Sequence, residues 1–251
     1  MFSQTDTKYI VNHHAPFDII GDIHGCFDEL ITLLKKLDYT IDAKNRFLCT
    51  HPDNRTLIFV GDLTDRGPKS PDVLRLVMEN VSKGRAFCVN GNHDDKLRRY
   101  LKGNSVTISH GLEDTIEQLA LQPASFSKEV YTFLESLQSH LIFDDGKLVA
   151  THAAMKEKYI GQDSKGIRSF CLYGPTTGKL DKDGLPTRLP WVSSYTGKAL
   201  IAYGHETIKK SCVENNTVNL DTGCVFGGEL TALRYPEMTL ISVPAQKQYA
   251  K

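Results

Sequence analysis

The sequence has no excess of charge of either sign. Its 251 residues include 30 Lys and Arg against 30 Asp and Glu, so the formal net charge at pH 7 is zero. Whole-molecule electrostatics therefore do not draw the chain onto nucleic acid or an anionic membrane. Any polyanion that it binds must be held by a local group of residues.

Paired cysteines, long apolar runs and a nucleotide-binding loop are also missing. The six cysteines are scattered without a C-x-x-C pair, which argues against a disulfide scaffold and predicts reduced thiols. No stretch approaches the roughly 20 apolar residues of a membrane span, and the N-terminus lacks the apolar core of a signal peptide. We therefore expect a cytoplasmic protein without a membrane partner. The G-x-x-x-x-G-K-[ST] loop is absent, so no nucleotide kinase is expected in this chain.

The length suits one large domain. Three short apolar runs, at residues 17–22, 56–62 and 86–91, each end in Gly beside Asp or Asn, which is typical of buried strands that stop at a polar loop. Leucines and valines at helical spacing separate them. This strand-helix alternation predicts parallel strands, whose carboxyl ends form the usual ligand site of such a sheet.

The rest of the chain predicts helices and then more strands. Residues 94–102, 112–121 and 126–140 have helical patterns, and a strand-rich second half follows them. Two strand-rich parts separated by helices predict two sheets that face each other. Residues 155–191 show no clear periodicity and are expected to form a long loop.

Polar residues able to bind a metal follow five of the expected strands. They are Asp22, His24, Asp62, Asn92, His93, His152 and His205. Asp22 and His24 are two residues apart, so in an extended segment both can reach one cation. A single His after a strand is more often structural, but five such loops together are harder to explain that way. A mixed set of Asp, Asn and His suits Mn²⁺, Fe or Zn²⁺ better than Ca²⁺ or Mg²⁺.

These loops carry a family resemblance. GDIHG at 21–25, GDLTDRG at 61–67, GNHD at 91–94, THA at 151–153 and GH at 204–205 resemble the signature series of the phosphoprotein-phosphatase-type (calcineurin-like) metallophosphoesterases. Further similarity, which includes SHGLEDT, LYGPTTG and NLDTGCVFGGELTALRYPE, covers nearly the whole chain. It resembles the phosphatase domain of bacterial polynucleotide kinase-phosphatases and the bacterial asymmetric diadenosine-tetraphosphatase-like enzymes.

The resemblance implies a fold and a domain organisation. The fold would be an α/β, four-layer αββα metallophosphoesterase sandwich with two mixed sheets and flanking helices. We expect residues 1–16 to be an N-terminal extension and residues 17–251 to be a single metallophosphoesterase domain.

The resemblance also implies a centre with two divalent metal ions. Asp22 and His24 would hold the first ion, Asp62 would bridge both, and Asn92, His152 and His205 would complete the second. Mn is the first expectation for the metal, with Fe, Zn, Ni or Co as alternatives. Two such ions about 3.5–4 Å apart polarise phosphoryl oxygens and acidify a water for in-line attack.

The same resemblance gives catalytic and substrate-binding roles. His93 would protonate the leaving oxygen, and Asp65 would orient its imidazole. Arg66 would hold the phosphate with its planar guanidinium. Asn92 and Arg168 are further candidate substrate contacts.

Three sequence features can be interpreted either as structural or solvent-exposed or as functional. Glu206 and Thr207 stand where Thr-Pro is usual in similar sequences, and the Glu206 carboxylate could add charge near the metals or point to solvent. Asp221 is expected first to shape a strand end behind His205 and second to support the ligands. The helix after GNHD carries four cations, Lys96, Arg98, Arg99 and Lys102, which form either a solvated face or a guide for an anionic polymer end.

The predicted function is phosphoester hydrolysis, with the substrate left open. The resemblance favours phosphate or 2',3'-cyclic phosphate at a nucleotide or RNA end, and it also allows membership of a larger repair assembly, although no obligate protein partner is evident. Dinucleoside tetraphosphates come second, and phosphoserine or phosphothreonine in proteins comes third. A function of a different class, a non-catalytic metal-containing module that binds nucleotides, is the remaining alternative.

Overall fold

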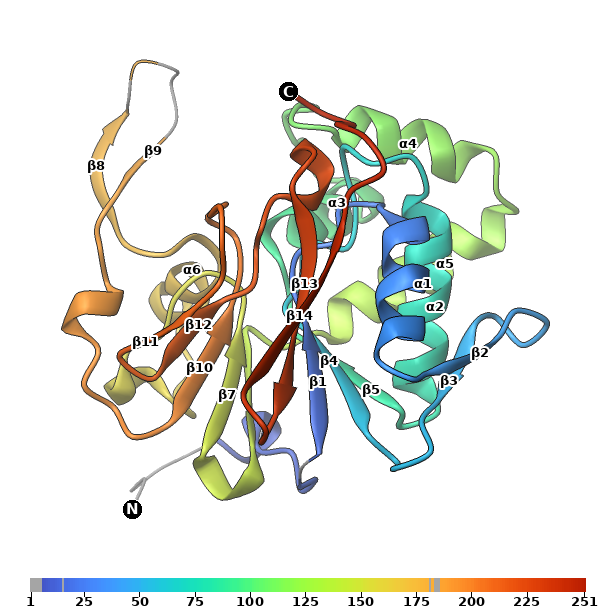
Figure 1. The fold of residues 1–251 in the computed structure, drawn as a ribbon. Helices are drawn as coiled ribbons and strands as arrows, with labels where there is room; N and C mark the ends of the chain where they lie inside the picture. The colour runs from blue at the N-terminus through green and yellow to red at the C-terminus, as the bar shows by residue number, and fades with distance from the viewer. Residues whose placement is uncertain (1–5, 15, 181, 183–185) are drawn as a thin grey trace.

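The structure is a computed structural model that describes residues 6–14, 16–180, 182 and 186–251. Two five-stranded sheets lie face to face in the middle of the molecule (Figure 1), and helices cover their outer faces. Both sheets contain parallel and antiparallel pairs. The predicted sandwich of two mixed sheets with flanking helices is confirmed.

The first sheet contains the three strands that the sequence predicted to be parallel. Its order is β14 (Thr239–Pro244), β13 (Glu229–Tyr235), β1 (Phe17–Ile20), β4 (Thr56–Phe59) and β5 (Ala86–Cys88). β1, β4 and β5 pair in parallel, whereas β13 runs antiparallel to β1. Each parallel strand ends two or three residues before its apolar run does, because the chain leaves the ladder to form the polar loop.

The second sheet has the order β11 (Val213–Glu214), β12 (Thr217–Asn219), β10 (Leu200–Tyr203), β7 (Leu148–Thr151) and β6 (His140–Phe143). β6 and β7 form an antiparallel hairpin, and β7 pairs in parallel with β10. A buried apolar cluster that includes Phe17, Ile58, Phe143 and Leu148 fills the space between the two sheets. Burial of this shared surface fixes how the loops of one sheet face those of the other.

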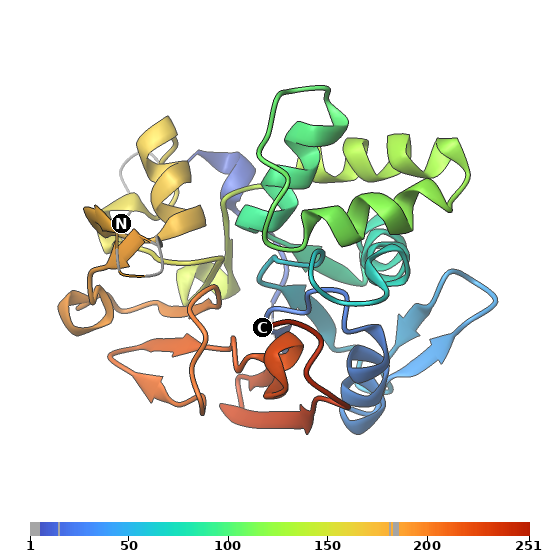
Figure 2. The same cartoon turned by 90° about the horizontal axis from the view of Figure 1, so that it is seen from above.

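Helices cover the two sheets unequally. α1 (Phe27–Lys36) and α2 (Ser70–Ser82) pack on the first sheet, with α3 (Asn92–Leu101), α4 (Leu112–Ala120) and α5 (Ala124–Ser136) beside them. α6 (Lys165–Tyr173) lies against the other sheet, on the opposite side of the molecule (Figure 2). Within the described residues, no helix has the length and hydrophobicity that a membrane span requires.

The prediction that residues 155–191 form one long loop is wrong. This stretch contains the short turn η3 (Glu157–Tyr159), α6 and a hairpin of β8 (Thr176–Leu180) and β9 (Pro186–Arg188). Ser164 caps α6 by accepting a hydrogen bond from the Ile167 N–H. The structure also contains a small hairpin of β2 (Thr40–Asp42) and β3 (Leu48–Thr50) that the sequence pattern did not indicate.

The described part of the predicted N-terminal extension packs on the second sheet. Residues 1–5 and 15 lie outside the description. Tyr9, in the turn η1 (Thr7–Tyr9), is 1% exposed and its ring stacks on His140 at a centroid distance of 4.0 Å. Val11 N–H donates to the Ile142 carbonyl at 2.9 Å. The domain boundary at residue 17 stays a prediction.

His140 should make stability depend on pH. Burial lowers the pKa of this imidazole to about 4, and its Nε2 accepts a hydrogen bond from the Gly161 N–H. The folded-state pKa lies below the unfolded value of about 6.5, so the contribution is present above that value and is lost as pH falls. We expect His140 to account for about 2 kcal/mol of lost stability between about pH 7 and pH 5.

Urea unfolding of wild type and His140→Gln across that pH range measures the pH-dependent contribution of His140 to the free energy of unfolding. Gln keeps a hydrogen-bond acceptor but does not titrate, so its profile should be flatter by that amount. Parallel profiles for the two proteins would show that His140 titrates normally.

Candidate active site

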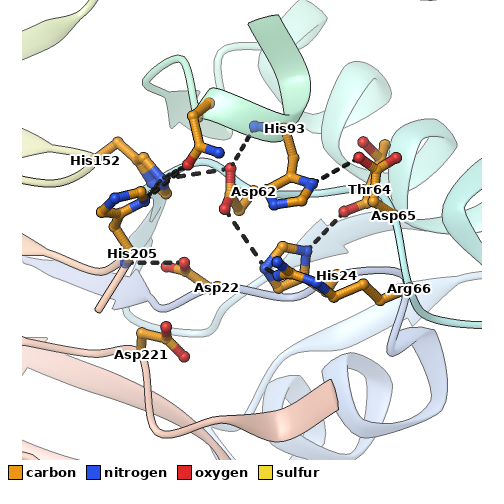
Figure 3. Close-up of polar contacts among 12 residues, drawn as sticks. Asp22, His24, Asp62, Thr64, Asp65, Arg66, His93, His152, His205 and Asp221 are labelled. Atoms are coloured by element: carbon orange, nitrogen blue, oxygen red, sulfur yellow. Dashed lines mark hydrogen bonds and ion pairs between the residues drawn. The ribbon is translucent and has the colours of Figure 1, made fainter. Parts of the chain in front are cut away.

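The loops that follow β1, β4, β5, β7 and β10 meet at one edge of the sandwich (Figure 3). They bring together all six predicted metal ligands, Asp22, His24, Asp62, Asn92, His152 and His205. The first sheet supplies four of them and the second sheet supplies two. The site therefore exists only when the two sheets are packed together.

Asp62 is the centre of this arrangement and is 2% exposed. Its Oδ2 lies 3.5 Å from His24 Nε2, and its Oδ1 lies 3.4 Å from His152 Nε2. Asp62 takes part in two groups of residues whose potential ligand atoms lie within 4.8 Å of one another: His24, Asp62 and His93, and then Asp62, His152 and His205. Asp62 is common to both groups and presents one oxygen to each, which is the geometry that a bridging carboxylate needs.

The second group, Asp62, His152 and His205, points its ligand atoms at a position that attracts positive charge. Asn92 Oδ1 lies 2.9 Å from His152 Nε2 and 2.8 Å from His205 Nδ1. His152 Nδ1 donates to the Val60 carbonyl at 2.9 Å, which directs Nε2 at the group. Burial lowers the pKa of His152, but the Asp62 and Asp22 carboxylates and the Val60 carbonyl together raise it to about 9.

The first group presents a lone pair on His24. His24 Nδ1 donates to the Thr64 carbonyl at 2.8 Å, and Arg66 Nη1 donates to His24 Nε2 at 2.8 Å. Burial, and then the charges of His93 and Arg66, hold the pKa of His24 well below its usual value. A neutral imidazole with its Nε2 turned toward Asp62 is the form that binds a metal ion.

Asp22 supplies an unsatisfied carboxylate beside both groups. Its Oδ2 accepts the His205 backbone N–H at 2.9 Å, and its Oδ1 is buried without a hydrogen-bond partner among the described residues. A Cβ on Gly204 would lie 1.8 Å from that oxygen, so only glycine fits there. Asp22 belongs to neither three-residue group by distance, but its orphaned oxygen fits the same cations. The histidine, carboxylate and amide donors suit Mn²⁺, Fe or Zn²⁺.

Asp221 brings a second negative charge to the neighbourhood of Asp22. Its Oδ1 accepts the Gly223 N–H and its Oδ2 accepts the Thr207 hydroxyl, both at 3.0 Å, so it shapes the strand end as expected. Burial, and then the charge of Asp221, raise the pKa of Asp22 well above its usual value. Two buried carboxylates so close together again favour a bound cation.

His93 has the predicted carboxylate partner. Its Nδ1 lies 2.6 Å from Asp65 Oδ2, and its ring meets the His24 ring edge-on at 4.8 Å. Asp65 is fully buried, and its Oδ1 accepts the Thr115 hydroxyl at 2.7 Å. Thr115, the last residue of SHGLEDT, was missed as a positioning residue because its role depends on where α4 packs.

Arg168 does not join the cluster. It lies on α6, pairs with Asp163, and its side chain is 46% exposed. It lines a separate cavity of about 280 Å³ together with Lys8 and Arg98. The geometry therefore gives no support to the predicted phosphate contact at Arg168.

Arg188 is the arginine that the sequence reasoning missed. It lies in β9, and its Nη1 is buried without a hydrogen-bond partner in the described part of the chain. Burial, His152 and then Arg188 lower the pKa of His205, which places the guanidinium charge near the second group. Burial lowers the pKa of Arg188, and the negative charge of the exposed Glu206 opposes that shift, so this carboxylate acts on the arginine. No periodicity or motif around residue 188 could have indicated this.

Most cations on the basic side of α3 already have hydrogen-bond or ion-pair partners. Arg98 and Lys102 both pair with Glu135, and Lys96 donates to Ser109. Three of the four cations thus already have partners, which favours the solvated-face interpretation over a guide for RNA.

Comparisons with known proteins agree with this geometry. The profile of the calcineurin-like phosphoesterases matches residues 15–242. The asymmetrical bis(5'-nucleosyl)-tetraphosphatase PrpE of Anoxybacillus flavithermus is 46% identical over 237 residues, covering 93% of this chain and 96% of that protein. The protein of the same name from Bacillus subtilis is 45% identical over 237 residues, with the same coverage. A solved structure provisionally described as a diadenosine tetraphosphatase has a TM-score of 0.67 at 25% identity, covering 94% of this chain and 98% of that one.

Replacing Asp62 should disrupt both metal positions together. We expect wild type to bind two Mn²⁺ ions and Asp62→Ala to lose at least one of them, with the remaining affinity lowered by 10-fold or more, on the order of the loss seen when metal-site contacts are removed. Asp65→Asn is the matched control, because Asp65 contacts His93 and none of the six candidate ligands. Calorimetric titration of the metal-free proteins measures this, and two unchanged sites in Asp62→Ala would contradict the bridging role.

Proposed function

We propose that this chain, which belongs to the calcineurin-like phosphoesterase family, hydrolyses dinucleoside tetraphosphates asymmetrically into a nucleoside monophosphate and a nucleoside triphosphate. The observation that carries the proposal is similarity over nearly the whole chain to relatives named for this reaction. The chain is a metal-dependent phosphoesterase. An RNA or nucleotide end, favoured from the motifs alone, becomes the second substrate to test.

The six ligands of the candidate site would hold the two divalent cations that the family uses. When bound, these ions supply Lewis acidity toward the phosphoryl oxygens and acidify a water. We propose Mn²⁺ as the native ion. Asp62 would contribute to both positions, because its two oxygens face different histidines.

Two arginines would hold the phosphate chain. Arg66 reaches the first ligand group, and Arg188 lies near His205 of the second. The Arg188 Nη1 group is buried and has no hydrogen-bond partner among the described residues, so an incoming phosphoryl oxygen would satisfy it. Since the chain has no net charge, these local cations and the metals carry the attraction for a polyanion.

His93 would protonate the leaving oxygen. Its imidazole is held by Asp65, which Thr115 fixes in turn. The leaving group of a tetraphosphate is a phosphate oxygen with a pKa of about 6, so it departs with little need of a proton from His93. A ribose alkoxide needs the proton far more.

A substrate panel tests the proposed specificity. For the Mn²⁺-loaded protein we expect kcat/KM for diadenosine tetraphosphate to exceed that for a 2',3'-cyclic mononucleotide, a 3'-phosphorylated oligonucleotide and a phosphopeptide. The products should be AMP and ATP without ADP. Faster hydrolysis of the oligonucleotide or the phosphopeptide would reject the proposal.

The role of His93 has its own signature. His93→Ala should slow hydrolysis of a ribonucleoside monophosphate by roughly 10²- to 10⁴-fold, because its alkoxide needs a proton. Diadenosine tetraphosphate and p-nitrophenyl phosphate should lose much less. Asp65→Asn should show the same selectivity more weakly, since it disturbs only the orientation of His93. Equal losses on all three substrates, with metal content unchanged, would mean that His93 is not the acid.

A further inference from the structure

A second cavity adjoins the candidate active site at Arg66. Its volume is about 520 Å³, within the roughly 300–1,000 Å³ of small-molecule sites. Its lining includes Arg66, His110, Glu113, Asp114, Phe226 and Tyr249. Apart from Arg66, none of these side chains has a part in the metal centre or the proton transfer described above.

Arg66 connects this cavity to the reacting centre. Its Nη1 contacts His24 Nε2 at 2.8 Å, and its guanidinium carbon lies 5.2 Å from the centroid of the Phe226 ring. Phe226 is therefore only one side chain away from the first ligand group. An aromatic ring and a guanidinium plane are the two protein surfaces on which nucleobases stack.

The segment that carries His110 is fixed against Arg66. Arg66 N–H donates to the Gly111 carbonyl at 3.3 Å, and a Cβ on Gly111 would lie 2.3 Å from that nitrogen. His110 has a φ of 60°, a left-handed conformation that strains residues other than glycine and is concentrated at functional sites. Burial, Lys96 and Arg66 lower the pKa of His110, so its ring offers one donor and one acceptor.

The other wall is formed by the end of the chain and is held in place. Tyr249 N–H and Ala250 N–H donate to the Val225 carbonyl at 2.9 and 3.0 Å. The Tyr249 hydroxyl donates to the buried Glu29 carboxylate at 2.7 Å. The C-terminus lies near the centre of the molecule when it is viewed from above (Figure 2). The cavity is thus bounded by anchored segments on both sides.

The charges of the cavity distinguish a base from a phosphate. Lys251 adds a positive charge on the side of Tyr249, whereas on the α4 side the exposed carboxylates of Glu113 and Asp114, in the first turn of the helix, repel phosphate oxygens. They accept hydrogen bonds from the ring N–H and exocyclic amino groups of a purine. A substrate whose phosphate lies at Arg66 and whose base lies by Phe226 meets attractive groups at both ends.

We propose that this cavity is a nucleoside subsite, in which Phe226 stacks on the base of the nucleotide whose phosphate contacts Arg66. The inference rests on the proposed function for its biological role. The phosphoryl groups of a dinucleoside tetraphosphate are chemically similar. Asymmetrical cleavage therefore requires the protein to bind a nucleoside at a position that determines which phosphoryl group reaches the metals. A base held at a fixed distance from the metals would select that phosphoryl group.

Competitive inhibition tests the subsite without using a tetraphosphate. Hydrolysis of p-nitrophenyl phosphate by the Mn²⁺-loaded full chain is measured with AMP or inorganic phosphate as inhibitor. We expect wild type to bind AMP more tightly than phosphate. Phe226→Ala should raise the inhibition constant of AMP by roughly 5- to 150-fold, the loss expected for one stacked base, and leave that of phosphate unchanged.

Three further variants sharpen the test. Phe226→Trp should restore AMP binding, because it keeps an aromatic face. Phe226→Leu keeps apolar volume without that face, so it should behave like Phe226→Ala and replaces it if the alanine variant fails to fold. Tyr131→Ala on α5 removes an aromatic ring that does not line this cavity and should change neither constant.

The outcomes separate the subsite from the proposed function. Equal inhibition of wild type by AMP and phosphate, or equal rises for both in Phe226→Ala, would overturn the subsite, since Phe226 would then act only through Arg66. If AMP binding depends on Phe226 but diadenosine tetraphosphate is not hydrolysed, the subsite stands and the proposed function fails.

Discussion

The candidate active site depends on the position and charge of one carboxylate, that of Asp62. Burial raises the pKa of this group, but the imidazoles of His152, His93 and His24 together hold it well below the usual value. His93 N–H donates to its Oδ1 at 3.0 Å, and a Cβ on Gly91 would lie 2.3 Å from the same oxygen. The side chain is thus anionic and fixed, with one oxygen toward each ligand group.

The backbone of Asp62 also holds the first loop. Its carbonyl accepts hydrogen bonds from the Ile23 and His24 N–H groups at 3.1 and 2.9 Å. The second group is completed by His152 and His205, which reach the site only because the second sheet packs on the first through their shared apolar cluster. Packing of the core and assembly of the site are therefore the same event, which explains why short motifs scattered along the chain can form one centre.

The sequence allowed prediction of those candidate site residues that lie in the loops directly after strands. The ligands Asp22 to His205 and the His93–Asp65 pair each sit in a polar loop after an apolar run, and the resemblance of those loops to family motifs gave the role of each residue. Arg188 and Thr115 could not be predicted, because their roles arise from how β9 and α4 pack. Arg168 was chosen from local similarity, yet its helix turns it toward Asp163.

The substrate also could not be predicted from the sequence motifs, because the metal-binding loops are shared by enzymes with different substrates. The side chains that would distinguish a nucleoside from a peptide or an RNA end, such as Phe226 and His110, lie outside those loops and meet only in the folded chain. α6 was missed for a simpler reason: Gly166 and Gly174 flank a short apolar set and obscure its helical spacing.

The central claim is that Asp62 bridges two metal ions at the meeting point of the two sheets. Anomalous diffraction at the manganese edge, from crystals grown with Mn²⁺, tests it most directly. The account predicts two peaks about 3.5–4 Å apart, each within bonding distance of a different Asp62 oxygen. A single peak, or two peaks of which only one contacts Asp62, would contradict it.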